Sequence, residues 1–359
     1  MKPGAQLKTA KKLPIRVLVA DGSAVVRTAV KRMLESDDAL QVVGTAYDGA
    51  DALQKTIALR PDVIALDIEI DPAGGRDTLR RIMAQCPLPV VMLSPASAEA
   101  AEQTLQALDE GAFDYVQKDL PRESGDISRW RCELVCKLKA AARAAGHNPP
   151  PQPIAHRIQP AEPVQVPVAA QVVCIGSSTG GPKALQQILP SLPAELPAAI
   201  LLVQHMPPGF TAAFARRLDS LCGMEVREAR SEEVVEPGLI LVAPAGWHML
   251  LHDRKSPHVR LSKVPENLLH RPSVDLLMNS AAEVFQAACM GIILTGMGSD
   301  GAQGMKGIFM RGGQTVGQDE NSCAVYGMPR SCAEQGVLRR ILPLSQISDE
   351  ILLDTGYKH

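Results

Sequence analysis

The chain lacks a strong net charge, a cysteine pair spaced for metal binding and any long apolar run. Its 37 Lys and Arg residues nearly balance 39 Asp and Glu residues, so we expect neither nucleic acid nor an anionic membrane as a partner. The eight cysteines include no CxxC pair and no His/Cys spacing that suits zinc, which favours reduced thiols. The basic start precedes an apolar run far shorter than the ~18 residues that span a bilayer. We therefore expect a cytoplasmic protein without a signal peptide or a membrane span.

The first part of the chain alternates short apolar runs with segments of helical period. The runs are rich in Val, Ile and Leu and read IRVLVA, QVVGTA, DVIALD, PVVML and FDYVQK. Fully apolar strands joined by helices indicate a parallel sheet that is covered on both faces. Residues 14–145 are therefore predicted to form a doubly wound α/β domain.

A proline-dense stretch separates this domain from a second one. No hydrophobic period persists within residues 146–170, which is typical of an extended linker. Residues 171–357 carry a second α/β pattern, with predicted strands QVVCIG, AAILLVQH, LILVAPA and GIILTG. Helices are predicted near 182–189, 209–221, 273–288 and 301–311. WHMLLH and HVRLSK are predicted to form an antiparallel hairpin attached to this sheet.

The stretch VVCIGSSTGGPKAL, residues 172–185, combines a strand, a run of small residues and a helix start. Gly176 and Gly181 have the interval of a phosphate-binding P-loop, but Pro182 stands where that loop requires lysine. Gly176 to Gly180 also match GxSxG, which places Ser178 on a sharp turn with an exposed hydroxyl. The N–H groups that open the helix could stabilise an oxyanion. Ser178 is thus a candidate nucleophile, and a plain serine turn is the alternative.

A serine nucleophile needs a base and an acid that orients the base. His205 follows the predicted strand AAILLVQ, and Asp300 follows GIILTG after a glycine turn. The carboxyl ends of parallel strands share one edge of the sheet, so we expect both side chains beside Ser178. His248, His252 and His270 are competing bases, the first two within the hairpin. The order Ser, His, Asp differs from that of an ordinary α/β-hydrolase.

Several motifs in order resemble the chemotaxis response regulator protein-glutamate methylesterases of the CheB type. They are IGSSTGG, QHMPPGFT, VAPAGWHM, HRPSVD, ILTGMGSDG and VYGMPR. The resemblance implies Ser178 as nucleophile, His205 as general base and Asp300 as its orienting acid. It also implies Thr179 beside the nucleophile and an oxyanion contact from the Met297 N–H. Ser177 stands where the family commonly has alanine and is interpreted as a small structural residue.

The resemblance implies hydrolysis of glutamate γ-methyl esters, and deamidation of specific glutamines, on the cytoplasmic helices of chemoreceptors. The chemistry would be acyl transfer, a step that requires no metal. Methyl-accepting chemotaxis receptors are the expected partners, and the histidine kinase of the pathway is a candidate phosphodonor. The first domain would be a flavodoxin-like receiver that regulates the hydrolase.

The receiver resemblance assigns roles to polar residues at four predicted strand ends. Asp67 would be the phosphoacceptor, Asp21 an acid of the metal site, and Ser94 and Lys118 contacts to the phosphoryl group. Gly22 replaces the second, metal-ligating acid of the family, and Asp119 replaces the usual proline after the lysine. Mg²⁺ held by Asp21 and Asp67 is therefore expected to be weak, unless water or Glu69 fills the gap.

Two readings of other classes stay open at this point. A non-catalytic adaptor could use the receiver fold to bind signalling proteins, and the altered acid pocket favours it for the first domain. A nucleotide-binding switch depends on the glycine turn after residue 175 alone. The set of Ser178, His205 and Asp300 favours the serine hydrolase.

Overall fold

The computed structural model describes residues 13–70, 74–118, 124–146 and 168–357. The chain forms two compact units with separate sheets. The boundaries inferred from the sequence, 14–145, 146–170 and 171–357, remain predictions, and nearly all of the inferred linker lies outside the described residues. All eight cysteines are free thiols. In the described part of the chain, no helix combines the length and apolarity needed to cross a membrane.

The first unit contains a five-stranded parallel sheet in the order β2-β1-β3-β4-β5, as its apolar runs predict. Its strands are β1 (Ile15–Ala20), β2 (Leu40–Ala46), β3 (Val63–Asp67), β4 (Val90–Ser94) and β5 (Asp114–Gln117). The helices that alternate with them are α1 (Ala24–Glu35), α2 (Gly49–Leu59), α3 (Gly75–Gln85), α4 (Ala98–Asp109) and α5 (Ser124–Ala144). β1 lies between β2 and β3, so the strand order reverses at β1 and β3, where open α/β sheets bind ligands.

The second unit contains a seven-stranded parallel sheet in the order β14-β13-β12-β6-β7-β9-β8. Its strands are β6 (Val172–Ser177), β7 (Ala199–Gln204), β8 (Glu225–Glu228), β9 (Leu239–Val242), β12 (Cys289–Ile293), β13 (Gln314–Gln318) and β14 (Arg340–Leu342). Its helices are α6 (Gly181–Ile188), α7 (Phe210–Asp219), α8 (Val274–Phe285), α9 (Ala302–Met310), α10 (Met328–Glu334) and α11 (Leu344–Asp354). Short 3₁₀ turns follow α6 at Leu189–Ser191 and α8 at Gln286–Ala288.

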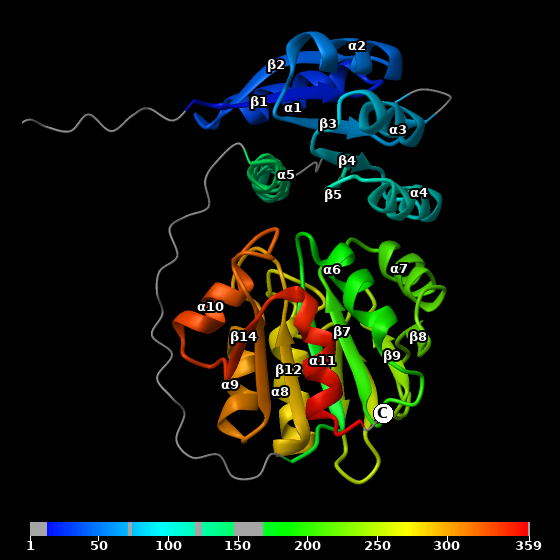
Figure 1. Cartoon of the computed structure of the whole chain (residues 1–359), viewed down its shortest axis with the longest axis vertical. Helices are drawn as coiled ribbons and strands as arrows, with labels where there is room; N and C mark the ends of the chain where they lie inside the picture. The colour runs from blue at the N-terminus through cyan, green and yellow to red at the C-terminus, as the bar shows by residue number, and fades with distance from the viewer. Residues whose placement is uncertain (1–12, 71–73, 119–123, 147–167, 358–359) are drawn as a thin grey trace, which may run out of the picture. The chain divides into compact units, whose positions relative to one another are not determined.

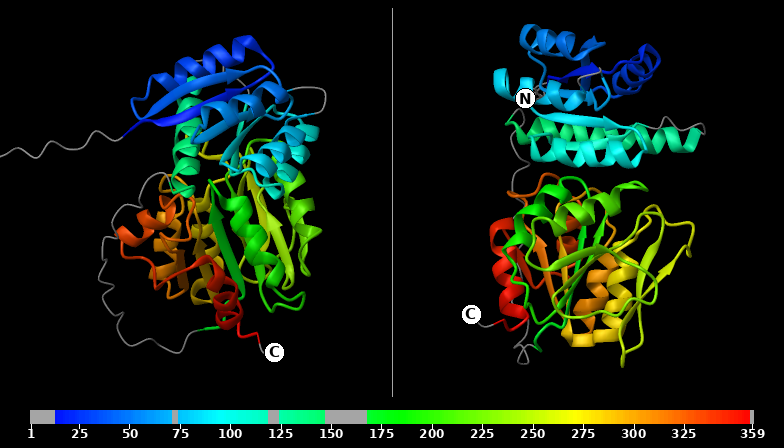
Figure 2. Two further views of the ribbon diagram at one scale, coloured as in Figure 1. Left: turned by 45° about the horizontal axis from the view of Figure 1, so that its top comes forward. Right: turned by 90° about the vertical axis from the view of Figure 1, so that its right-hand side faces the viewer.

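Helices cover both faces of the seven-stranded sheet. α6 packs with α11, and α8 packs with α9 and against β6 and β12. The turned view in Figure 2 shows α11 and α8 on opposite faces. β6, β7 and β12 are fully buried, which explains why the sequence shows them as unbroken apolar runs. The strand order reverses between β12 and β6 (Figure 1).

The hairpin predicted from WHMLLH and HVRLSK forms, but its attachment to the sheet was predicted wrongly. β10 (His248–His252) and β11 (His258–Ser262) make a separate antiparallel sheet. The apolar face of this hairpin packs into the cluster that includes Leu277 of α8, and Leu251 N–H donates to Ser280 Oγ at 3.0 Å. β10 pairs with β11 and packs against α8, because the alternating apolar residues of β10 form one face that is buried there.

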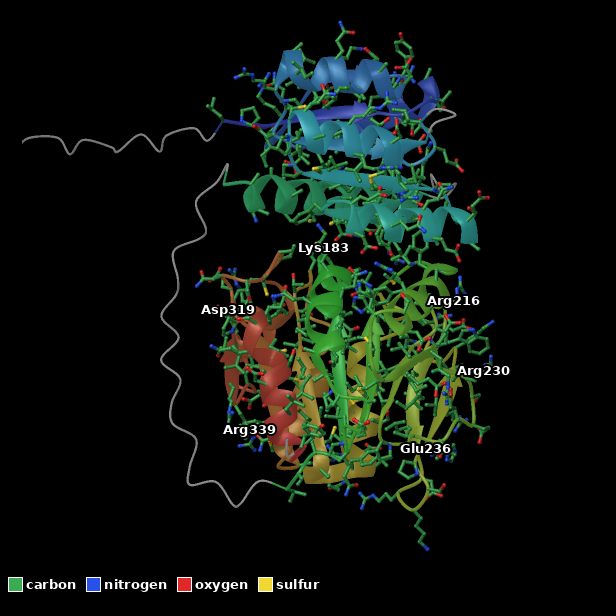
Figure 3. All side chains as sticks on the ribbon, turned by 45° about the vertical axis from the view of Figure 1, so that its right-hand side comes forward. Lys183, Arg216, Arg230, Glu236, Asp319 and Arg339 are labelled. Atoms are coloured by element: carbon green, nitrogen blue, oxygen red, sulfur yellow. The ribbon has the colours of Figure 1, made fainter. Side chains whose placement is uncertain are left out.

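Figure 3 shows the polarity of the seven-stranded sheet. Lys183, in the first turn after β6, and Asp319, directly after β13, lie toward one end of the unit. Arg339, directly before β14, and Glu236, shortly before β9, lie toward the other end. The residues that follow β6, β7 and β12 thus share the end marked by Lys183.

Candidate active site

The turn after β6 requires small residues because neighbouring side chains press against it. A Cβ added to Gly176 would lie 2.4 Å from a methyl carbon of Val274, and one at Gly181 would lie 2.0 Å from Gln204 Oε1. Gly180 has a φ of +76° and is the residue before α6, a conformation that glycine adopts without steric cost. Packing and backbone conformation thus account for glycine at these positions.

Gln204, the last residue of β7, joins the turns after β6 and β7. Its Oε1 accepts a hydrogen bond from Ser177 Oγ at 2.7 Å. Its Nε2 donates to the carbonyl oxygens of Ser178 at 2.9 Å and His205 at 3.0 Å. The side chain is only 2% exposed, so these bonds form away from water and fix the two turns relative to each other. Ser177, interpreted as a small structural residue, also supplies a hydroxyl to this network.

His205 and Asp300 come together as the sequence predicts. His205 Nε2 lies 2.8 Å from Asp300 Oδ2, and both side chains are mostly buried. His205 Nδ1 is buried and has no hydrogen-bond partner among the described residues. Ser178 follows β6 beside His205, whose N–H donates to the Ser177 carbonyl at 3.0 Å. Since Nε2 is engaged by the acid, Nδ1 is the nitrogen left for the serine hydroxyl.

The carboxylate of Asp300 lies at the N-terminus of α8. It accepts hydrogen bonds from Ser273 Oγ at 2.9 Å, Val274 N–H at 2.8 Å and Asp275 N–H at 3.0 Å. Burial raises the pKa of Asp300, but the hydrogen bond and charge of His205, followed by these backbone donors, lower it to about 2. Helix N–H groups favour a negative charge at this end. The acid is therefore held ionised throughout the neutral range.

Asp275, at the start of α8, in turn binds the start of α9. Its Oδ1 accepts hydrogen bonds from Gly301 N–H at 2.9 Å and Gly304 N–H at 2.8 Å, at the start of α9. Asp300, two residues before α9, thus caps α8, while Asp275, in the first turn of α8, caps α9. We call this arrangement the reciprocal caps. It fixes the backbone that follows Asp300.

The loop after β12 carries the proposed oxyanion donor. Thr295 Oγ1 donates to the carbonyl of Thr179 at 2.9 Å and accepts from Val325 N–H at 2.9 Å. Thr295 thus ties the loop to the turn that holds Ser178. Thr179 is 5% exposed, and Met297 is half-buried. Gly296 approaches Ser178 so closely that an added Cβ would lie 2.8 Å from Ser178 Cβ, so Met297 follows a residue in contact with the candidate nucleophile.

The other candidate histidines differ in their relation to the site. His248 is fully buried, and its Nε2 lies 3.1 Å from the Pro265 carbonyl. Burial lowers the pKa of His248, with smaller effects from neighbouring groups. His252 lies 3.0 Å from an Arg260 nitrogen on the hairpin. His270 stacks on His205 with ring centroids 4.0 Å apart and planes 12° from parallel. Only His270 touches the candidate base.

The predicted receiver residues follow neighbouring strands of the five-stranded sheet. Asp21 and Asp67 come from adjacent strands and are 0% and 2% exposed. Ser94 ends β4 and is buried, and Lys118 follows β5 and is half-buried. Asp21 Oδ1 accepts from Ser23 N–H at 2.7 Å. Asp119 lies outside the described residues.

The donor set of this edge permits at most a sparse magnesium site. Asp21 and Asp67 supply the hard carboxylate oxygens that Mg²⁺ prefers. Within the described ranges, no group of three His, Cys, Asp or Glu side chains is arranged to hold a metal. Glu69 N–H donates to Asp67 Oδ1 at 3.2 Å, so its backbone is tied to the phosphoacceptor candidate. The hard donors that this edge offers are therefore two carboxylates, those of Asp21 and Asp67.

Sequence reasoning missed the residues that hold the catalytic candidates in place. Gln204, Thr295, Ser273 and Asp275 act through hydrogen bonds to partners far away in the chain. A signal was present for one of them, because Ser273 directly before an apolar helical pattern is a typical N-cap. Nothing in the sequence indicates that this cap also faces Asp300.

Two family models match the chain. Residues 173–351 match the model described as CheB methylesterase, and residues 17–125 match the response regulator receiver domain. The protein-glutamate methylesterase/protein-glutamine glutaminase of Symbiobacterium thermophilum is 45% identical over 358 residues, covering 96% of this chain and 98% of that protein. The corresponding protein 1 of Geobacter sulfurreducens is 42% identical over 354 residues, covering 94% and 96%.

A solved structure agrees with the second unit. The crystal structure of the Thermotoga maritima CheB methylesterase catalytic domain is 40% identical, with a TM-score of 0.50. It covers 52% of this chain and 99% of its own.

Proposed function

Because the chain belongs to the CheB methylesterase family and carries a receiver domain, we propose that it hydrolyses γ-methyl esters of protein glutamates and deamidates glutamines. The observation that carries this proposal is the 2.8 Å contact of His205 with Asp300 beside the turn that holds Ser178. A histidine oriented by a carboxylate is the base that a serine nucleophile requires.

The first half of the reaction is acylation. Ser178 Oγ attacks the ester carbonyl carbon while its proton passes to His205 Nδ1, the nitrogen that Asp300 leaves available. Asp300 stays ionised and stabilises the imidazolium that forms, consistent with its pKa of about 2. The Met297 N–H and the N–H groups that open α6 stabilise the oxyanion. The Cδ–O bond to the methoxy group then breaks, and methoxide takes the proton from Nδ1 to leave as methanol.

The second half is deacylation by water. His205 Nδ1 takes a proton from water, the hydroxide oxygen bonds to the acyl carbon, and Ser178 Oγ leaves and recovers that proton. The products are free enzyme and a glutamic acid side chain, which releases a proton to water and becomes a carboxylate. A glutamine amide follows the same steps with ammonia as the leaving group.

The partners follow from the same family membership. We propose that the substrates are cytoplasmic helices of methyl-accepting chemotaxis receptors, which places this activity in the cytoplasm. The receiver domain regulates the hydrolase, with the histidine kinase of the pathway as a phosphodonor to Asp67. Asp21 and Asp67 would hold Mg²⁺, which neutralises phosphoryl charge when bound. Ser94 and Lys118 would contact the phosphoryl oxygens.

Methanol release from methylated receptor membranes tests the proposal. The wild type should release methanol, and Ser178→Ala should lose at least about 10³-fold in rate. Ser220→Ala, which removes an exposed hydroxyl from the end of α7, is the matched control and should keep the wild-type rate. Because the three residues act as a unit, Ser178→Ala/His205→Ala should be little slower than either single variant. Wild-type release by Ser178→Ala would refute the assignment, and receptor binding without release by the wild type would favour the adaptor.

A further inference from the structure

Four exposed apolar side chains lie in two loops beside the hairpin of the catalytic domain. Trp247 is 39% exposed, Val264 67%, Leu268 40% and Leu269 61%. Trp247 precedes β10, and the other three follow β11. We call these four residues the apolar rim. Large apolar side chains that are exposed together on one surface mark a contact site for another molecule.

The two loops are held together as one surface. Gly246 N–H donates to the Arg271 carbonyl at 3.0 Å, and His248 Nε2 lies 3.1 Å from the Pro265 carbonyl. The Lys263 ammonium lies 4.6 Å from the centre of the Trp247 ring. These contacts tie the loop near its beginning, at Lys263 and Pro265, and at its end, at Arg271, so both ends of the segment that carries Leu268 and Leu269 are held.

The apolar rim is continuous with the catalytic site. Leu269 directly precedes His270, whose ring stacks on His205 at a centroid distance of 4.0 Å. His205 in turn contacts Asp300 at 2.8 Å. A substrate side chain that reaches Ser178 therefore brings the surrounding protein surface over this loop.

On the premise of the proposed function, we propose that the apolar rim binds apolar side chains that flank the esterified glutamate on one face of a substrate helix. Residues three and four positions apart on a helix are neighbours, so a glutamate inserted into the site carries its helix face toward the rim. Lys263 and Arg271 outnumber Glu266 in this loop. The resulting positive charge complements carboxylates on adjacent turns of a glutamate-bearing helix. Recognition would thus resemble the docking of an amphipathic helix on an apolar surface.

The test compares two substrates for Leu269→Ser and Leu268→Ser/Leu269→Ser. One substrate is the methylated receptor in membranes, and the other is a single-residue glutamate γ-methyl ester too small to reach the rim. Loss of a buried leucine contact should lower kcat/KM for the receptor roughly tenfold, mainly through KM. The rate on the small ester should change by less than about twofold.

Two variants serve as matched controls. Met310→Ser and Leu353→Ser each remove an apolar side chain, 72% and 64% exposed, from the last turns of α9 and α11. Both should leave the rates on both substrates unchanged. A loss that the controls share would show a general effect of surface polarity and would overturn the proposal.

The outcomes separate the docking proposal from the proposed function. Equal losses on both substrates would show that Leu269 acts on the chemistry through His270, and unchanged rates would show that the rim binds nothing; either result overturns docking. If the leucine variants hydrolyse the small ester faster than the wild type, another part of this chain occupies the apolar rim. If they lose a dimer in sedimentation while their receptor kinetics stay unchanged, a second copy of the chain occupies it. Each of these two results also overturns the proposal. Failure of the wild type on both substrates would instead contradict the proposed function.

Discussion

Asp275 is a half-buried carboxylate that positions another carboxylate. Its Oδ1 accepts the N–H groups of Gly301 and Gly304, on either side of the start of α9. Burial raises the pKa of Asp275, the N–H of Gly304 opposes this shift, and the charge of Asp300 adds to it. The side chain is therefore needed as an acceptor, whereas its charge carries a cost.

We expect the two roles to separate in Asp275→Asn and Asp275→Ala. Asn keeps an oxygen acceptor, so kcat/KM on the small ester should stay within about threefold of the wild type, whereas Ala should lose at least tenfold. Ala also leaves two N–H groups unpaired, at about 1–3 kcal/mol of stability each. Kinetics and thermal unfolding at several pH values measure both effects. Equal damage by Asn and Ala would contradict the positioning role.

The sign of the pH effect follows from the direction of the shift. A carboxyl group whose pKa is higher in the folded state costs stability as pH rises through that pKa. The free energy of unfolding of the wild type should therefore fall as pH rises above the ordinary range of aspartate titration. Asp275→Asn should not show this fall. A stability gain of Asp275→Asn that is larger in acid than at neutral pH would contradict this reading.

At the scale of elements, α11 ends on an unfavourable charge. Asp354 occupies its last turn, where a negative charge opposes the helix dipole. Its Oδ2 is buried without a hydrogen-bond partner among the described residues. Burial, then the charge of Glu350, raise the pKa of Asp354 to about 6, against the opposing effect of Arg340. Folding therefore favours the protonated form of Asp354.

Asp354→Asn should stabilise the catalytic domain at alkaline pH. The wild-type carboxyl costs stability as pH rises from about 4 through about 6, so the gain should reach about 1–2 kcal/mol at pH 8 and vanish near pH 4. This gain in stability is measured by urea unfolding in a Trp130→Phe background. Trp247 is then the one tryptophan, so its fluorescence reports on the catalytic domain alone. Asp349→Asn, exposed on the same helix, is the control. A gain that is equal at both pH values would contradict the prediction.

At the scale of the whole molecule, we expect Gly22 to limit how the receiver responds to phosphorylation. Mg²⁺ affinity falls when a direct carboxylate ligand is missing, and even loss of a supporting contact costs ~10 to 100-fold. We therefore expect poor labelling of Asp67 by acetyl phosphate at millimolar Mg²⁺. Gly22 does not have a positive φ, and an added Cβ would lie 3.1 Å from the Ile70 carbonyl oxygen. A small shift of that carbonyl would admit a side chain.

Gly22→Asp should tighten Mg²⁺ binding at least about tenfold and raise labelling of Asp67. Gly22→Ala adds the same Cβ without a carboxylate and should do neither, which separates ligand chemistry from steric effects. Calorimetric Mg²⁺ titration and acetyl phosphate labelling are the two readouts. Strong wild-type labelling that disappears in Asp67→Ala would show that water or Glu69 already completes the site.

The sequence allowed prediction of both sheets and of the turns that carry the candidate site. Each such turn follows an apolar strand, and the carboxyl ends of parallel strands share one edge. β8, β13 and β14 escaped prediction because they are short or interrupted by polar residues and glycine. The reciprocal caps and the bonds of Gln204 could not be predicted, because they join residues that only the assembled sheet brings together. The separate hairpin sheet was missed because alternation shows an apolar face but not its partner.

The reciprocal caps also limit which substitutions the site tolerates and how it can be grafted onto another protein. Asp300 satisfies the start of α8, and Asp275 satisfies the start of α9. Replacing either aspartate removes an acceptor from N–H groups at the start of the other helix, so a substitution at one position changes which substitutions the second position tolerates. A designer who grafts the histidine and its acid onto another scaffold must therefore carry both helix starts, as a module of two interlocked segments that fold together.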